Sequence, residues 1–153
     1  MDIKSSPLVQ FLLEACSQDI KLAMLSYWHL TVETESKNTI VGKWFKTVKR
    51  KLVDHLFKEN QVVYRALINQ VNFKRRLHSL SQKILKENNT NQKRRKALRR
   101  ALSDQSQIGD LEGGADRELF LINPDKKVTT LNPDEATIFK SNTAPFLLSF
   151  NSK

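Results

Sequence analysis

The stretch QKRRKALRRALSD at residues 92–104 contains the point at which the character of the chain changes. Its four apolar residues recur at the spacing of one helix face, among six basic residues. From Ser103 to residue 117 the chain becomes acidic, polar and glycine-bearing, which is typical of a linker. Residues 92–102 are therefore predicted to form the last helix of a helical region, with Ala97, Leu98, Ala101 and Leu102 on its apolar face.

Four further helices are predicted before this stretch. Ser5 or Ser6 can cap the first helix, which has Pro7 in its first turn and breaks at residues 16–18. Asp19 can cap the second, and so short a connection predicts an antiparallel hairpin. The third begins after residues 36–38, and Asn60 marks the turn into the fourth. The fourth continues to Leu85, before residues 88–91 interrupt the pattern.

We expect one apolar stripe of each helix to face the core. In the first two helices the stripes are Leu8, Phe11, Leu12 and Ala15, then Leu22, Leu25, Trp28 or His29, and Val32. In the third the stripe is Ile40, Val41, Trp44, Val48, Leu52, His55 and Leu56, with Lys43, Lys46, Lys49, Arg50 and Lys51 on the outer face. In the fourth it is Val63, Leu67, Gln70 or Val71, Lys74, Leu77, Leu80 or Ser81, Ile84 and Leu85.

Beyond the linker, the pattern is that of strands. Short apolar runs at residues 118–122, 128–130, 136–139 and 146–150 are separated by turn residues, including those at 123–125. The expected fold is mainly α, with antiparallel helices followed by a few antiparallel strands. Because a few strands without a packed partner are marginal in water, residues 118–153 are expected to be an incomplete domain. The predicted boundaries are 1–102 for the helices, 103–117 for the linker and 118–153 for the strands.

Composition excludes several classes of protein. The 153 residues include one cysteine and three histidines without metal-site spacing, which argues against a disulfide-stapled module and a structural zinc site. Apolar runs such as residues 8–13 are far shorter than the roughly 20 residues of a membrane span, and residues 1–4 lack the layout of a signal peptide. We expect an intracellular chain that neither is secreted nor spans a membrane.

The net charge of +10 is a local feature. Residues 74–100 hold eleven basic residues and one acidic residue, whereas the rest of the chain is neutral. Three interpretations of residues 74–100 are open. The segment binds nucleic-acid phosphates, binds an anionic membrane, or is a helix surface that only faces water. Residues 74–100 include no aromatic residue, which argues against the stacking of bases of a single-stranded nucleic acid. The candidate contacts are Lys93, Arg94, Arg95, Lys96, Arg99 and Arg100.

No complete active site is visible. His29, His55 and His78 have no ligand or catalytic partner at helical spacing, and we interpret them as residues at the boundary of core and solvent. Cys16 is expected to be a packed thiol, and Tyr27, Trp28 and Trp44 are expected in the core. The nucleophile-elbow, zinc-protease, dinucleotide, P-loop and protein-kinase motifs are absent from the sequence.

Several stretches resemble class III phosphatidylinositol 3-kinases. Residues 8–16 (LVQFLLEAC) and 27–33 (YWHLTVE) are similar to the last repeats of that family's helical domain. Residues 76–80 (RLHSL), 93–96 (KRRK) and 101–104 (ALSD) resemble its basic linker helix, and residues 131–141 (LNPDEATIFKS) resemble the start of its kinase N-lobe. The stretches occur in the family's order and cover nearly the whole chain.

The resemblance implies an armadillo-like helical solenoid that leads into a lipid-kinase N-lobe. It implies that the loop over the ATP phosphates comprises Ile138, Phe139, Lys140, Ser141, Asn142, Thr143, Ala144 and Pro145. In such a loop the Ser141 hydroxyl and backbone N–H groups would face phosphate oxygens, Phe139 and Pro145 would flank the nucleotide, and Lys140 would lie near its mouth. Without the resemblance, residues 141–143 are an ordinary turn.

The resemblance also implies a cofactor, partners and a location. The parent enzyme would use ATP with Mg²⁺ or Mn²⁺ to phosphorylate the 3-hydroxyl of phosphatidylinositol on endosomal and autophagic membranes. Its partners would be a regulatory serine/threonine-kinase-like subunit and a Beclin-type subunit. The chain stops before the family's ATP-binding lysine, catalytic loop and metal-binding aspartate, so we expect this segment alone to be inactive and to bind no cofactor tightly.

A second interpretation is a non-catalytic helical scaffold. In it, the basic face of residues 74–100 binds an anionic membrane or an acidic protein partner.

Overall fold

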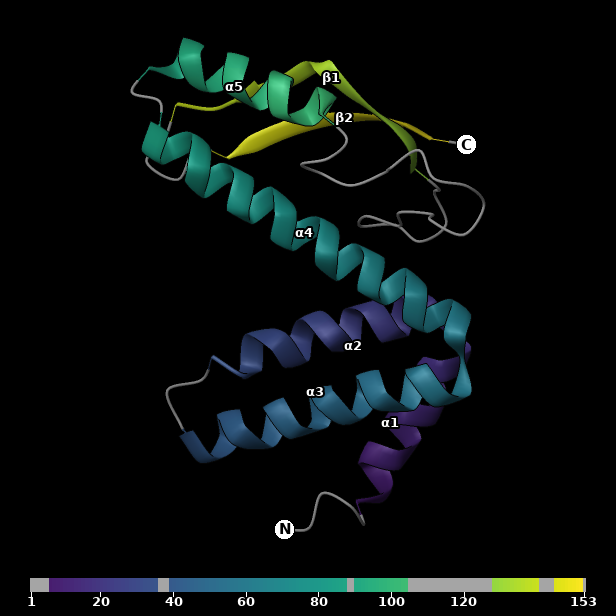
Figure 1. Cartoon of the computed structure of the whole chain (residues 1–153). Coiled ribbons are helices and arrows are strands. Elements are labelled where there is room, and N and C mark those ends of the chain that lie inside the picture. The colour runs from purple at the N-terminus through teal and green to yellow at the C-terminus, as the bar shows by residue number, and fades with distance from the viewer. Residues whose placement is uncertain (1–5, 36–38, 88–89, 105–127, 141–144, 153) are drawn as a thin grey trace. The chain divides into compact units, whose positions relative to one another are not determined.

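A computed structural model describes residues 6–35, 39–87, 90–104, 128–140 and 145–152. The described part is mainly helical, with five α-helices and two antiparallel strands (Figure 1). The chain divides into two compact units, residues 1–68 and residues 69–153. Within the described residues, no helix is long and apolar enough to cross a membrane.

Unit 1 contains α1 (Pro7–Gln18), α2 (Ile20–Glu33), α3 (Thr39–Glu59) and the first residues of α4 (Gln61–Glu87). Each pair among α1, α2 and α3 is in contact. Asp19 alone separates α1 from α2, and its Oδ1 accepts hydrogen bonds from the backbone N–H groups of Lys21 (2.7 Å) and Leu22 (3.1 Å). The predicted cap is therefore confirmed, because this carboxylate satisfies donors that the first helical turn leaves unpaired.

The start and end of α1 differ from the expectation. Ser6 occupies the N-cap position of α1, but its side chain makes no capping hydrogen bond, whereas Pro7 lies in the first turn as expected. The expected break at residues 16–18 is wrong, because α1 continues to Gln18. Cys16 and Ser17 are buried, so the packing of this last turn keeps it helical.

The faces predicted for α1 and α2 are wrong. In α1, Val9, Leu13 and Cys16 are buried, whereas Leu8 and Phe11 are 74% and 69% exposed. In α2 the buried residues are Ala23, Met24, Tyr27 and Leu30, whereas Leu25 and Val32 are exposed. Both helices have apolar residues on two sides, and tertiary packing selected the side that the spacing had not favoured.

The stripes of α3 and α4 were predicted more successfully. Val48, Leu52 and Leu56 of α3 are buried, but Ile40 and Val41 at its start are exposed. In α4 the predicted residues that are buried are Val63, Leu67, Gln70, Val71, Leu80 and Ile84. Lys74 is exposed, and its neighbour Phe73 takes the buried position instead. Asn60 forms the predicted junction, and its Oδ1 accepts from the N–H groups of Val62 (3.1 Å) and Val63 (3.2 Å).

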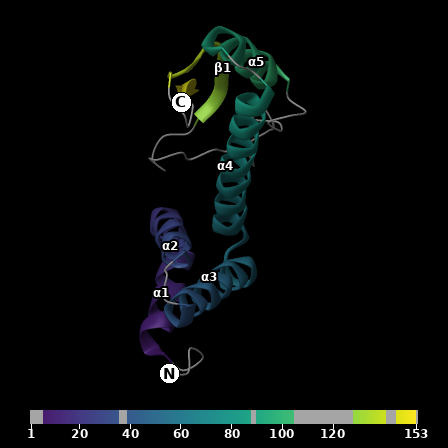
Figure 2. The same ribbon diagram turned by 90° about the vertical axis from the view of Figure 1, so that its left-hand side faces the viewer.

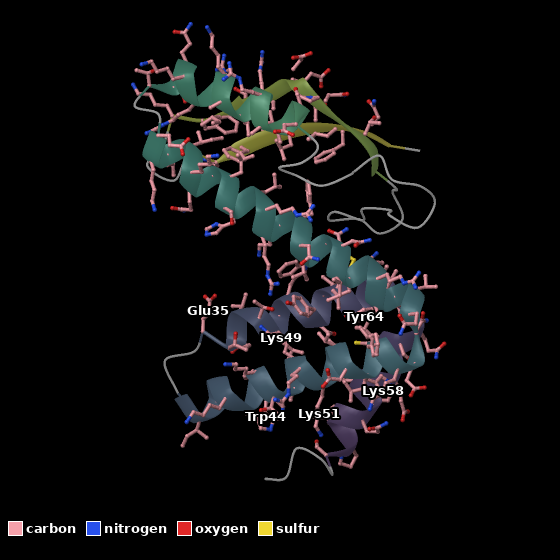
Figure 3. All side chains as sticks on the ribbon, in the orientation of Figure 1. Glu35, Trp44, Lys49, Lys51, Lys58 and Tyr64 are labelled. Carbon is pink, nitrogen blue, oxygen red and sulfur yellow. The ribbon has the colours of Figure 1, made fainter. Side chains whose placement is uncertain are left out.

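Side chains also join α2 to α3 within unit 1. Tyr27 is buried as expected, whereas Trp28 and Trp44 are half-buried. Lys49 of α3 is directed toward α2 (Figure 3), where its Nζ lies 5.6 Å from the centre of the Tyr27 ring and 3.5 Å from Thr31 Oγ1. The ammonium group thus lies over an aromatic face, a position that ring electrostatics favour.

Unit 2 contains the rest of α4, α5 (Asn91–Ser103), β1 (Val128–Ile138) and β2 (Phe146–Ser152). The strands pair antiparallel, with Leu131 opposite Phe150 and Ile138 opposite Phe146, and the register shifts between Asn132 and Thr137. Two runs predicted as separate strands, 128–130 and 136–139, are therefore one irregular strand that ends at Ile138. The predicted strand at 118–122, the turn at 123–125 and the linker after Asp104 lie outside the described residues.

The core of unit 2 lies between its helices and the hairpin. Helix α5 contacts β1, and Figures 1 and 2 show it lying across the strands. The buried residues are contributed by α4, α5 and β1: Phe73, Leu80, Ile84, Leu98, Ala101, Leu102, Ala136 and Ile138. The hairpin is thus covered by an apolar helix face, which supplies the packed partner that an isolated hairpin lacks.

Candidate anion-binding surface

Helix α5 contains the highest density of basic residues in the chain, and its apolar face packs on the β1–β2 hairpin. Thr90 caps it, since its Oγ1 accepts from the N–H of Lys93 at 3.3 Å and its backbone oxygen accepts from that of Arg94 at 2.9 Å. Leu98, Ala101 and Leu102 are buried against the hairpin as predicted. Because the apolar face is occupied, the remaining faces of the helix are left to the basic side chains.

Four of the six predicted contact residues on α5 are exposed, namely Lys93, Arg95, Lys96 and Arg100. Lys93, Lys96 and Arg100 are spaced by three and four residues, so they share one side of the helix. At 1.5 Å per residue this stripe spans about 10 Å along the helix axis. The stripe therefore presents three cations in a row, and its length is similar to that of a few neighbouring phosphate groups.

The other two predicted residues, Arg94 and Arg99, are half-buried. Arg99 Nε donates to the backbone oxygen of Ala136 on β1 at 3.1 Å. Its guanidinium thus contributes to the packing of α5 on the hairpin.

Asn91 makes a second side-chain hydrogen bond between α5 and β1, which the sequence interpretation missed. Its Nδ2 donates to the backbone oxygen of Ile138 at 3.4 Å. Ala136 and Ile138 are two residues apart, so their carbonyl groups point to the same edge of β1. Asn91 and Arg99 together occupy this edge with side-chain donors. The eight-residue spacing that places both on one side of α5 was visible in the sequence, but their acceptor strand was not.

The second half of α4 adds further exposed cations, at Lys74, Arg75, Arg76, Lys83 and Lys86. Phe73, Leu80 and Ile84 are buried on the same stretch of helix, so the charges lie away from the core. Charge in unit 2 is thus carried on the outer faces of two helices.

The ends of the predicted phosphate loop belong to the β1–β2 hairpin. Ile138 is buried at the end of β1, whereas Phe139, Lys140 and Pro145 are exposed. The N–H of Phe139 donates to the backbone oxygen of Pro145 at 3.1 Å and closes the base of the connection. Ser141, Asn142, Thr143 and Ala144 lie outside the described residues.

The histidines and the cysteine are placed as follows. His55 is half-buried, as expected for a boundary position, whereas His29 and His78 are exposed. Cys16 is fully buried, and burial raises the pKa of its thiol, opposed by a 3.5 Å hydrogen bond from Sγ to Ser26 Oγ. A raised pKa keeps the thiol protonated and unreactive, as predicted for a packed cysteine. Among the residues the structure describes, no group of three or more histidine, cysteine or acidic side chains could hold a metal ion.

In comparisons with known proteins, no protein-family model matches the chain, and no curated protein matches it significantly.

Proposed function

We propose that the chain is a segment of a class III phosphatidylinositol 3-kinase, made of the end of its armadillo-like helical domain and the start of its kinase N-lobe. The observation that carries this proposal is the packing of the basic helix α5 on the β1–β2 hairpin. The residues that resemble the family's linker helix and those that resemble its N-lobe meet in one core. The mutual contacts of α1, α2 and α3 support the helical-domain part.

In this proposal α5 holds the hairpin, and the hairpin connection at residues 138–145 faces the ATP phosphates. Leu98, Ala101 and Leu102 share a core with Ala136 and Ile138 of β1, while Asn91 and Arg99 occupy the outer edge of this strand. ATP with Mg²⁺ or Mn²⁺ donates its γ-phosphate to the 3-hydroxyl of phosphatidylinositol in the parent enzyme. The regulatory kinase-like and Beclin-type subunits would bring that enzyme to endosomal and autophagic membranes.

The test is to read the transcript beyond the codon of Lys153 and to assay the product of the extended reading frame. We expect a strand with an ATP-binding lysine, then a catalytic loop and a metal-binding aspartate. The extended product should transfer phosphate from ATP to the 3-hydroxyl of phosphatidylinositol in vesicles. The 153-residue chain is the control and should be inactive, because phosphoryl transfer needs metal neutralisation and in-line positioning together. A stop codon, or an extended product without this activity, refutes the proposal.

The second candidate is a scaffold that binds anionic membrane through unit 2. It is favoured by the exposed stripe of Lys93, Lys96 and Arg100 on the side of α5 away from the core. Sedimentation with phosphatidylserine-containing vesicles should recover the chain at low salt and lose it at about 0.5 M salt, where exposed charges are screened beyond roughly 4 Å. Equal recovery with phosphatidylcholine vesicles, or recovery only with an acidic protein, contradicts the membrane role.

A further inference from the structure

Unit 1 contains a groove that neither proposed function uses. It has a volume of about 670 Å³ and lies between the C-terminal parts of α1 and α3. Side chains from α1 line one wall and two side chains from α3 line the other. The residues that matter below are Gln10, Phe11, Glu14, Ala15, His55 and Glu59.

Hydrogen bonds join the helix ends that border the groove. Asn60, which follows α3, donates from Nδ2 to the backbone oxygen of Ser17 at 2.8 Å and so joins the ends of α1 and α3. Ser17 Oγ donates to the backbone oxygen of Glu14 at 2.7 Å, and Gln10 Nε2 donates to Glu14 Oε1 at 2.8 Å. The Glu14 carboxylate is thereby oriented by its own helix rather than left to rotate freely.

The electrostatics of the groove favour a cation. Glu14 and Glu59 bring one carboxylate from each wall. The residues that line the groove include no lysine and no arginine. Lys51 and Lys58 lie near His55 on α3, but neither is among the residues that line the groove.

The groove also offers an apolar contact. Phe11 is 69% exposed beside Ala15, and Leu8 one turn earlier on α1 is exposed as well. Exposure of a phenyl ring to water is unfavourable, and a ligand that covers it gains binding free energy roughly in proportion to the apolar area removed from water. The site therefore combines an apolar surface with negative charge at one end.

We propose that this groove binds a segment of a partner protein that presents an arginine or lysine beside a large apolar side chain. The cation lies between Glu14 and Glu59 at the helix ends, and the apolar side chain covers Phe11 and Ala15. An arginine fits best, because its planar fork can donate to both carboxylates. The sequence between residues 104 and 118 is also acidic, so variants of Glu14 and Glu59 decide whether a basic peptide binds at this groove.

The experiment titrates the whole chain into a short fluorescent peptide with leucines on one face and arginines at every third or fourth position. We expect saturable binding by anisotropy, and no binding of a twin peptide with uncharged glutamine in place of arginine. Glu14→Gln combined with Glu59→Gln should weaken binding about tenfold or more, because charge-assisted hydrogen bonds are lost. Phe11→Ser should also weaken it.

Matched controls are Glu35→Gln and Leu25→Ser, which change exposed side chains of the same kinds outside the groove. Both should leave the affinity unchanged. If Phe11→Ser fails to fold by circular dichroism, the nearly isosteric double glutamine variant still decides the question. Equal binding of the two peptides, unchanged affinity of the double glutamine variant, or absence of saturable binding each overturns the proposal.

Discussion

At the residue scale, two polar side chains determine where the helices of unit 1 turn. Asp19 and Asn60 each accept hydrogen bonds from two backbone N–H groups of the following helix. Asn60 also donates to the backbone oxygen of Ser17, forty-three positions away in the sequence. The capping role follows from local residue chemistry, whereas the long-range donation depends on the packing of α1 against α3.

Cys16 gives unit 1 a predicted pH dependence. Burial raises the pKa of its thiol in the folded state, so the folded state holds this proton more tightly than the unfolded chain does. The contribution to stability is fully present below the unfolded pKa and is lost as pH rises through the folded one. Unfolding free energy should therefore fall with rising pH above the ordinary thiol range, by up to about 1.4 kcal/mol per pH unit.

The measurement is denaturant unfolding followed by tryptophan fluorescence, since both tryptophans lie in unit 1. Cys16→Ala is the control, because it removes the titrating group while its packing defect is independent of pH. The difference in unfolding free energy between the two proteins should shrink as pH rises. A difference that stays constant with pH contradicts a thiol kept neutral by burial.

At the element scale, α5 shows how one helix can carry two roles. Its apolar side completes the core of unit 2, and its exposed side carries a cationic stripe. Because the two sides are separate, the charge can be changed without altering the core. The apolar side cannot be changed in the same way, because the hairpin would then lose the helix face that covers it.

Leu98→Ala should therefore destabilise unit 2 by about 2–5 kcal/mol, as expected for truncating a side chain with no exposed surface. Hydrogen exchange of the amides in α5 and β1 measures the effect, because neither tryptophan nor tyrosine lies in unit 2. Leu147→Ala on β2 is the matched control, with a side chain 54% exposed, and should change protection little. Similar exchange in both variants would show that α5 does not support the hairpin.

At the scale of the whole molecule, the basic excess is concentrated in residues 74–100 of unit 2, and this allows a controlled test of the membrane proposal. Lys93, Lys96 and Arg100 on α5 have the same residue types, spacing and exposure as Lys43, Lys46 and Arg50 on α3. Replacing either triplet by glutamine removes the same charge. Replacing the α5 triplet by glutamine should weaken the affinity for phosphatidylserine vesicles strongly. The loss should be roughly tenfold or more if each residue contributes about 1 kcal/mol.

The α3 triplet should have a smaller effect, because only Lys49 and Lys51 adjoin it on α3, whereas α5 also carries Arg94, Arg95 and Arg99 and α4 adds five exposed cations within unit 2. Equal loss from both triplets would mean that the vesicles respond to net charge alone. The comparison needs no assumption about how the two units are placed, because each variant is compared with the unchanged chain.

Sequence reasoning predicted the existence of the five helices because helical periodicity and the junction residues Asp19 and Asn60 are local features. It identified α5 nearly to its ends, since the interruption at residues 88–91 and the change of composition at Ser103 delimit it, although it did not identify Thr90 as the cap. It failed on the buried faces of α1 and α2, where Leu8 and Phe11 formed as good a stripe as Val9 and Leu13. It placed the basic candidate residues on α5, but the separation into exposed and half-buried ones required the structure.

The sequence by itself determined the helical character, the junctions at Asp19 and Asn60, the strand character after the linker and the position of the excess charge. These depend on propensity, capping and composition, which act over a few residues. Only the tertiary structure decided which side of α1 and α2 is buried, that Asn91 and Arg99 occupy the edge of β1, and that Glu14 and Glu59 face one groove. The physical reason is that burial and side-chain partners depend on residues distant in sequence, and periodicity cannot distinguish two apolar faces of one helix.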